Sequence, residues 1–146
     1  MRNILRGVLA LGLLGFIVFT TYLIKANSPQ PQTPADVQIL KRTLSLLSLE
    51  ENWLPGDDRD CARQQKQRSV YCALVKASTE VSGEFRVRSA SVRKLLWAIG
   101  QVKPDSGYRV PLRDFSNDPT VGLEQVHQAL NTAIEALEKD WAEGAQ

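Results

Sequence analysis

The chain has few of the residues from which catalytic and metal sites are usually built. Its 146 residues include one histidine, His127, and two cysteines, Cys61 and Cys72. The cysteines do not form a C-x-x-C pair, and a single imidazole is too little to complete a zinc site with them. The segment Asn117 to Thr120 lacks the alternating aspartates of a calcium-binding loop. We therefore expect no metal and no cofactor.

Acidic residues are absent from the first 35 positions, and this stretch contains an uncharged run from Gly7 to Ile24 with basic residues on both sides. The run has eighteen residues. At about 1.5 Å per helical residue it would be roughly 27 Å long, close to the hydrocarbon core of a bilayer. The sequence therefore predicts a signal-anchor transmembrane helix within residues 1–26, in contact with membrane lipid through residues 4–25.

A cleaved signal peptide is the alternative to an anchor. Its apolar region usually has about 7 to 15 residues, which is shorter than this run. The best cleavage point, after Ala26, has Ile24 where a small residue is needed. Arg2 and Arg6 favour a cytoplasmic N-terminus, so the rest of the chain would be extracytoplasmic. We expect a single-pass membrane protein, with secretion after cleavage as the alternative.

Two further parts follow the anchor. Residues 27–34 contain three prolines and no charge, which is typical of an extended, semi-rigid linker. Residues 35–146 have the length of one small domain with one modest core. The predicted organisation is therefore an anchor over 1–26, a Pro/Gln linker over 27–34 and a helical domain over 35–146.

Helical patterns dominate the domain. Thr33, Ser69 and Ser89 are suited to cap the N-termini of three helices, and Asp118 or Thr120 to cap a fourth. The fourth helix has the clearest apolar stripe, formed by Leu123, Val126, Leu130, Ile134, Leu137 and Trp141. Side chains at this spacing share one helix face, so we expect that face to lie against the core.

Turn residues predict where the other helices end. We expect the first to stop before the segment 52–56, the second near Gly83, and the third at Gly100 in a left-handed C-cap. Only Glu84–Arg88 and Tyr108–Leu112 alternate in a way that suggests short strands. The predicted fold is all-α, a small bundle of about four helices with irregular connections.

Charge is distributed in blocks. Residues 59–113 carry twelve Lys or Arg and four acids, whereas residues 114–146 carry seven acids and one lysine. One interpretation is that the two regions pair at the domain surface, where each ion pair contributes about 0 to 1 kcal/mol. The other is that the basic region is a binding face for anionic lipid or an acidic partner. Nucleic acid is not an expected partner outside the cytoplasm.

Three short motifs stand out: Asn52-Trp53, Tyr71-Cys72-Ala73-Leu74, and Phe115-Ser116-Asn117-Asp118-Pro119. With them, residues 37–137 resemble an uncharacterised family of small bacterial helical domains. The chain departs from that family at Val75, where glycine is frequent, at Ser116, which separates the aromatic residue from Asn117, and in its N-terminal anchor. The resemblance implies a helical fold and no named activity. The residues that the resemblance singles out are Trp53, Tyr71, Phe115, Asn117 and Asp118, and we call them the motif residues.

The two cysteines favour a disulfide, because an even number outside the cytoplasm usually pairs. Joining Cys61 to Cys72 would close a loop of about a dozen residues and stabilise the fold by roughly 3 kcal/mol. The resemblance includes only Cys72, so Cys61 looks like an added partner. The alternative is one buried, inert thiol and one exposed thiol.

A thiol-dependent hydrolase can also be assembled from these residues. Cys72 lies near an expected helix N-terminus, which activates thiols, and His127 would serve as its base, oriented by Asn117 or Asp118. A disulfide at Cys72 would exclude this mechanism. A histidine packed against the core is the simpler interpretation of His127.

Three functions remain open. The favoured one is a membrane-tethered, extracytoplasmic binding or accessory module without enzymatic activity, whose partner is another envelope or membrane protein. The second is the thiol hydrolase with Cys72 and His127. The third is a structural small subunit of a membrane complex that contacts its neighbours through the anchor.

Overall fold

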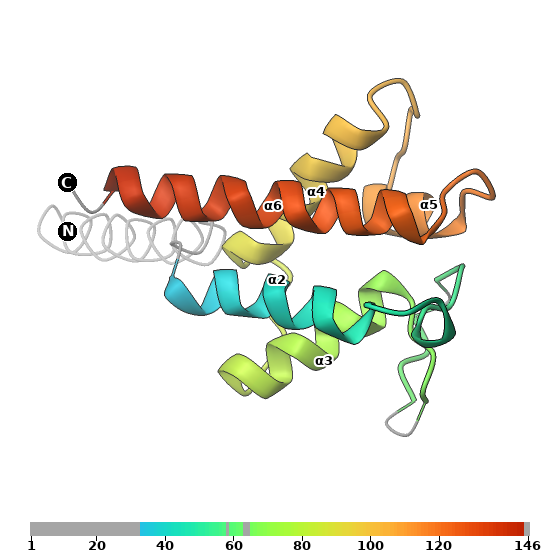
Figure 1. Ribbon diagram of the computed structural model, residues 1–146, viewed down its shortest axis with the longest axis horizontal. Helices are drawn as coiled ribbons and strands as arrows, with labels where there is room; N and C mark the ends of the chain where they lie inside the picture. The colour runs from blue at the N-terminus through green and yellow to red at the C-terminus, as the bar shows by residue number, and fades with distance from the viewer. Residues whose placement is uncertain (1–32, 58, 63–64, 145–146) are drawn as a thin grey trace, which may run out of the picture.

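The computed structural model describes residues 33–144 except 58, 63 and 64 (Figure 1). These residues form five α-helices and one short 3-10 helix, namely α2 (Pro34–Leu46), η1 (Glu50–Asn52), α3 (Val70–Ser82), α4 (Ala90–Val102), α5 (Pro111–Asn117) and α6 (Leu123–Gly144). Within that part of the chain there is no β-strand, only an isolated bridge between Trp53 and Arg68. The predicted all-α fold of the domain is confirmed.

None of the helices in the described ranges combines the length and the apolar character needed to cross a bilayer. The predicted anchor, residues 1–26, lies outside the described residues, as does the linker up to residue 32. Pro34, the last residue of the predicted linker, is the first residue of α2. Proline is favourable there, since the first helical residue needs no partner for its missing N–H.

Helices α2 and α6 lie side by side in opposite directions, α3 packs on α2, and α4 crosses α6 (Figure 1). Lys41 Nζ is 2.6 Å from Glu138 Oε1, so the middle of α2 lies beside the last turns of α6. The core side chains that are fully buried include Leu40, Leu74, Leu95, Ile99, Phe115, Leu130 and Leu137. One core is therefore shared by all five helices.

Three helices begin where the sequence predicts. Ser69 and Ser89 cap α3 and α4 by accepting a hydrogen bond from the backbone N–H three residues later. At α2, Thr33 and Asp36 form a capping box. Asp36 Oδ1 also accepts a hydrogen bond from the N–H of Ser91 at 2.9 Å, so one buried carboxylate caps both α2 and α4.

The helix ends agree less well with prediction. Gly83 ends α3 in the left-handed conformation, with φ of 81°, as predicted. The prediction that Gly100 ends α4 is wrong, because the N–H of Lys103 still donates to the carbonyl of Ile99 at 2.9 Å and the helix continues to that point. Helix α2 stops at Leu46, before the short η1.

The predicted caps of the last helix are also wrong. Asp118 Oδ1 accepts a hydrogen bond from the N–H of Thr120, and Oδ2 accepts one from the hydroxyl of Tyr108, so this side chain serves the preceding loop. At the start of α6, the N–H of Gly122 instead donates to Gln125 Oε1 at 2.9 Å. The apolar stripe is as predicted up to Leu137, but Trp141 is half exposed.

A fifth helix stands where the sequence suggested a strand. Alternation in Tyr108–Leu112 favoured extended structure, but α5 begins inside this range, and Asp114 Oδ2 caps it by accepting the N–H groups of Arg109 and Val110 at 2.8 Å each. A helix of seven residues has too few turns to show a clear period. Glu84–Arg88 forms no strand either and connects α3 to α4.

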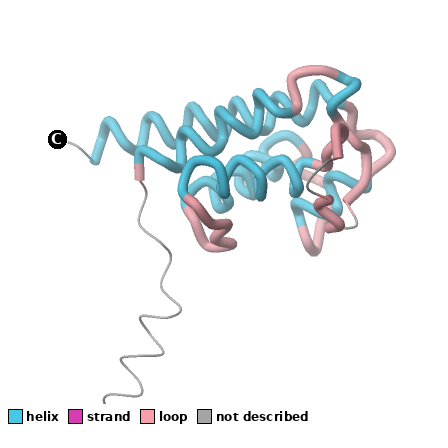
Figure 2. The backbone as a smooth tube through the Cα atoms, turned by 90° about the horizontal axis from the view of Figure 1, so that it is seen from below, coloured by secondary structure: helices cyan, strands magenta, loops and turns pink. Residues whose placement is uncertain are grey.

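The bundle has two distinct ends (Figures 1 and 2). The tether end, as we name it, comprises the start of α2 at Thr33, the connection 83–89 and the last turns of α6. The motif end comprises the described residues of 47–69, together with α5 and the connection 118–122. Most of the irregular backbone gathers at the motif end, so the loops that can carry a site lie far from where the described chain begins.

Candidate functional site

A groove of about 700 Å³ opens at the motif end, between the segment after η1 and the connection from α5 to α6. Its lining consists of Trp53, Pro55, Gly56, residues 116–122 and Gln125. The motif residues Trp53, Asn117 and Asp118 thus line one groove, although their segments are far apart in the sequence. We name this the motif groove.

Backbone hydrogen bonds fix the wall of the groove that follows η1. The N–H of Leu54 donates to the carbonyl of Arg68, and the N–H of Arg68 donates to that of Asn52, both at 2.9 Å. The N–H of Gly56 donates to the carbonyl of Ser116 at 2.7 Å, which joins the two walls directly. Gly56 has φ of 96°, a conformation that residues with a side chain rarely adopt. Glycine is therefore needed where this backbone approaches Ser116.

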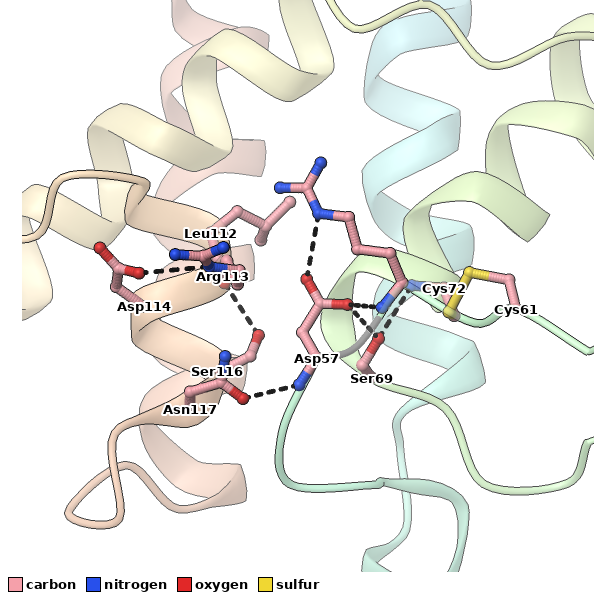
Figure 3. Close-up of polar contacts among 10 residues, drawn as sticks. Asp57, Cys61, Ser69, Cys72, Leu112, Arg113, Asp114, Ser116 and Asn117 are labelled. Carbon is pink, nitrogen blue, oxygen red and sulfur yellow. Dashed lines mark hydrogen bonds and ion pairs between the residues drawn. A yellow bond between two sulfur atoms is a disulfide. The ribbon is translucent and has the colours of Figure 1, made fainter.

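Asp57 is a buried carboxylate behind the groove (Figure 3). Its N–H donates to Asn117 Oδ1 at 2.8 Å, and its Oδ1 accepts the N–H of Arg59 at 3.0 Å and the hydroxyl of Ser69 at 3.4 Å. Its Oδ2 has no hydrogen-bond partner and lies 3.9 Å from Arg59 Nε. Because Ser69 caps α3, Asp57 connects the end of α5 to the start of α3.

The disulfide between Cys61 and Cys72 is present, as the sequence predicts. It fastens the irregular segment after Arg59 to the first turn of α3. Arg59 itself has a left-handed φ of 65°, which costs a residue with a side chain about 1 kcal/mol. Its guanidinium lies 4.8 Å from the ring centre of Tyr71, and this cation–π contact helps to hold it.

A second polar cluster fixes the other wall. The hydroxyl of Tyr108 donates to Asp118 Oδ2 at 2.6 Å, and Lys103 Nζ lies 3.4 Å from the same oxygen and 2.8 Å from Thr120 Oγ1. The hydrogen bond from Tyr108, followed by those from Thr120, lowers the pKa of Asp118. Burial first, and the bond to Asp118 second, raise the pKa of Tyr108. The connection after α4 therefore clamps the connection before α6.

Three hydrogen-bond donors in the groove lining have no partner among the described residues. The side-chain oxygens of Asn117 and Gln125 both accept backbone N–H groups, which identifies the opposite atom of each amide as its NH₂ group. Neither NH₂ group is hydrogen bonded in the described part of the chain. The indole N–H of Trp53, a side chain only 6% exposed, is also without a partner. The groove thus has unpaired donors, and its lining suits hydrogen-bond acceptors.

The structure does not assemble a thiol-enzyme site. Cys72 is bonded to Cys61, so it has no thiol to act as a nucleophile. His127 Nε2 lies 2.7 Å from the carbonyl oxygen of Leu47, and Asn117 is hydrogen bonded to Asp57. Each proposed catalytic residue therefore has a separate structural partner, and His127 satisfies a carbonyl just past the end of α2.

The motif residues divide into two groups. Phe115 is buried in the core and meets Tyr108 edge to face, with ring centres 6.4 Å apart. Tyr71 is half-buried and packs against Phe85 in the same way at 5.6 Å. These aromatic residues support the fold, whereas Trp53, Asn117 and Asp118 also line the groove.

Sequence reasoning did not identify Asp57 or Gln125. A useful signal for Asp57 was the turn-forming pair Gly56-Asp57 between the first motif and Ser69, since aspartate in such a turn bonds to nearby N–H groups. Burial of its carboxylate is a tertiary effect without a local signature. Gln125 carried the sequence pattern of an N-terminal capping side chain, three residues after Gly122.

Other polar features serve the bundle itself. Among the described residues, three ion pairs join the basic region to the acidic end: Lys94 to Asp140 at 2.6 Å, Lys103 to Asp118 at 3.4 Å, and Arg113 to its neighbour Asp114 at 3.6 Å. Across the described ranges, no three His, Cys, Asp or Glu side chains converge on a possible metal site. A second cavity of about 470 Å³ lies beside the disulfide, but the cation Lys76 on its wall is already paired with Glu80 at 2.6 Å.

Comparison with known proteins gives the family but no activity. No curated protein and no solved structure matches the chain significantly. The model of a family of unknown function, DUF6197, matches residues 29–136, which include all of α2 to α5 and most of α6. This match agrees with the expected relation to an uncharacterised family of small domains. The chain belongs to the DUF6197 family.

Proposed function

We propose that the chain is a membrane-tethered, extracytoplasmic binding module without enzymatic activity, and that its ligand binds in the motif groove. The observation that carries this proposal is that Asn117 and Gln125 each bring an NH₂ group without a partner among the described residues to one groove, beside the buried, unpaired indole N–H of Trp53. The buried indole N–H of Trp53 bears the cost of about 1 to 3 kcal/mol of an unpaired buried donor, whereas Asn117 is exposed and Gln125 half-buried, so their NH₂ groups would exchange water for a ligand acceptor.

The ligand that fits this lining is an extended peptide segment of an envelope or membrane protein. Its backbone carbonyls would accept from the unpaired donors, while Trp53, Pro55 and Pro119 provide apolar contact. The walls are fixed by the disulfide and by the Asp57 and Tyr108 hydrogen bonds, so little ordering is needed on binding. The disulfide also supports an oxidising, extracytoplasmic location.

Cross-linking in intact membranes tests the groove. A photoreactive benzoylphenylalanine in place of Pro119, an exposed residue of the lining, should give one discrete cross-linked product. In this background, Gln125→Glu keeps the oxygen that accepts from Gly122 but replaces the unpaired NH₂ group by an acceptor. The yield should fall about tenfold, because one good hydrogen bond is lost and a charge is placed against carbonyls.

Gln128→Glu is the matched control, since it makes the same change on the exposed face of the same helix. It should leave the yield unchanged. Equal yields for Gln125→Glu and Gln128→Glu, in variants with equal melting temperatures, would contradict binding through the groove. A product that forms equally with the probe at position 128 would favour the alternative in which the anchor makes the contact.

A further inference from the structure

Exposed apolar side chains are concentrated toward the tether end. Large ones among the described residues are Leu49, Val87, Trp97, Val110 and Trp141. Three of these are Val87 on the connection 83–89, Trp97 near the middle of α4, and Trp141 on the last turns of α6. Their exposed fractions are 68%, 47% and 45%. Each is thus left uncovered by the bundle.

Trp97 and Trp141 lie on neighbouring parts of this surface. Trp141 continues the apolar stripe of α6 one turn beyond Leu137, which is fully buried, to a position that no other helix of the described residues covers. The next residue back, Asp140, is paired with Lys94 at 2.6 Å, and Lys94 Nζ lies 5.4 Å from the ring centre of Trp97. One ion pair therefore joins the two helix surfaces that carry the indoles.

Basic side chains lie beside Val87 and Trp97. Arg86 and Arg88 flank Val87, and Arg93 lies one turn before Trp97 on α4. The nearby acids are paired, Glu84 with Arg86 and Asp140 with Lys94, and on the last turns of α6 Glu138 with Lys41 and Glu143 with Lys139. Arginine beside tryptophan and aliphatic side chains is typical of protein surfaces that meet phospholipid headgroups.

The described chain begins beside this surface. Thr33 and Arg86 line one small cavity of about 250 Å³, so Thr33, the first described residue, lies at the tether end. Eight residues separate Ile24, the end of the uncharged run, from Thr33, which makes nine residue-to-residue steps. At about 3.1 Å per extended residue they reach roughly 28 Å. The motif end lies farther from Thr33 than the rest of the tether end does, by nearly the length of α6. This helix has 22 residues with a rise of about 1.5 Å each.

We propose that the tether end is a membrane-contact surface, with Trp97 and Trp141 at the level of the lipid headgroups and Arg86, Arg88 and Arg93 toward lipid phosphates. The occupant is the bilayer that residues 1–26 would cross, so the inference rests on the tethering part of the proposed function. Tryptophan favours this depth because its ring is apolar and its N–H still reaches water or headgroups. The contact would orient the motif groove away from the membrane.

Tryptophan quenching in nanodiscs tests this contact with the full chain. The discs contain phosphatidylcholine and phosphatidylglycerol, with acyl chains either plain or brominated near the headgroup. Bromine quenches only indoles that touch the lipid, so total emission should fall about twofold, since two of the three tryptophans would lie at headgroup depth. In Trp97→Phe/Trp141→Phe the remaining buried Trp53 should show almost no quenching.

The outcomes separate the inference from its premise. Protein that stays in the discs after an alkaline wash but shows no quenching would overturn the membrane contact and leave the tether in place. Protein that washes off would contradict the tether and the contact together. Two further results would overturn the membrane contact. One is quenching that persists in the double variant, and the other is cross-linking between copies of the chain through Trp141 without quenching. Arg86→Gln/Arg88→Gln should reduce the quenching gained on adding phosphatidylglycerol.

Discussion

The two ends of the bundle are held together by different interactions. At the motif end, loops are fastened by the Cys61–Cys72 disulfide, the buried Asp57 and the hydrogen bond from Tyr108 to Asp118. At the tether end, helices start on local caps, and one buried carboxylate, Asp36, joins two of them.

The difference follows from backbone hydrogen bonding. A helix satisfies its own N–H and C=O groups, so its ends need only a cap. Irregular segments need partners from side chains or covalent links, and these partners also fix their shape. The motif residues Asn117 and Asp118 therefore shape a groove, while the tether end leaves apolar area such as Trp141 uncovered.

The largest loss of stability is expected for the substitution of a core residue on which both ends of the bundle depend. Leu130 is fully buried in the middle of α6, so Leu130→Ala should lower the free energy of unfolding by about 2 to 5 kcal/mol. Denaturant unfolding measures this. Gln128→Ala, on the exposed face, should change it by less than about 0.5 kcal/mol. Similar losses for both variants would mean that the buried face of α6 is assigned wrongly.

Opening the disulfide should be the largest effect confined to the motif end. Cys61→Ser and Cys72→Ser should each lower stability by about 3 kcal/mol, because either change releases the same loop. Thermal unfolding of the oxidised protein and of both variants compares them. A full loss with one variant and none with the other would contradict a shared structural role. Alkylation of Cys72 in the untreated protein would contradict the bond itself.

The hydrogen bond between Tyr108 and Asp118 gives a pH-dependent effect. Neutral Tyr108 contributes stability below the ordinary tyrosine pKa of about 10, and this is lost as the pH rises through its higher folded pKa. Asp118→Asn removes a charged acceptor, so the pKa of Tyr108 should fall back part of the way. Tyrosinate absorbance during an alkaline titration measures this shift.

Tyr108→Phe is the control, because it should remove the tyrosine with the highest pKa from the absorbance titration. If Asp118→Asn leaves that titration unchanged, then burial alone accounts for the raised pKa of Tyr108. The clamp across the motif groove would then contribute little, and the contrast between the two ends would weaken.

The smallest effect on folding is expected at the tether end. Trp141→Gln should change the free energy of unfolding by less than about 0.5 kcal/mol, because the side chain is half exposed. Denaturant unfolding in detergent-free nanodiscs and in detergent checks it. A loss near that of Leu130→Ala in both media would mean that Trp141 belongs to the core.

Local signals in the sequence predicted the fold well where one element supplies them all. Ser69 and Gly83 bound α3 as predicted, because the N-cap and the left-handed C-cap are chosen by backbone chemistry within a few residues. The same rule failed at Gly100, since a glycine inside a helix still makes its hydrogen bonds and packing on α6 continues the helix. Helix α5 escaped notice because its seven residues give too weak a period.

The sequence identified the motif residues, but it did not predict that some of them line one groove. Trp53 and Asn117 meet only after α3 and α4 have folded between them, so no local pattern places them together. Asp57 was missed for the same reason, because its burial depends on Asn117 and Ser69. The disulfide was accessible, since two cysteines allow a single pairing.

Paired photo-cross-linking of the full chain in its own membrane tests the central claim, that the two ends face different surroundings. One variant carries benzoylphenylalanine in place of Pro119 in the motif groove, and the other in place of Trp141 at the tether end. We predict a discrete protein product from position 119 and lipid adducts from position 141, both identified by mass spectrometry. Lipid adducts from position 119 and none from position 141 would contradict the account.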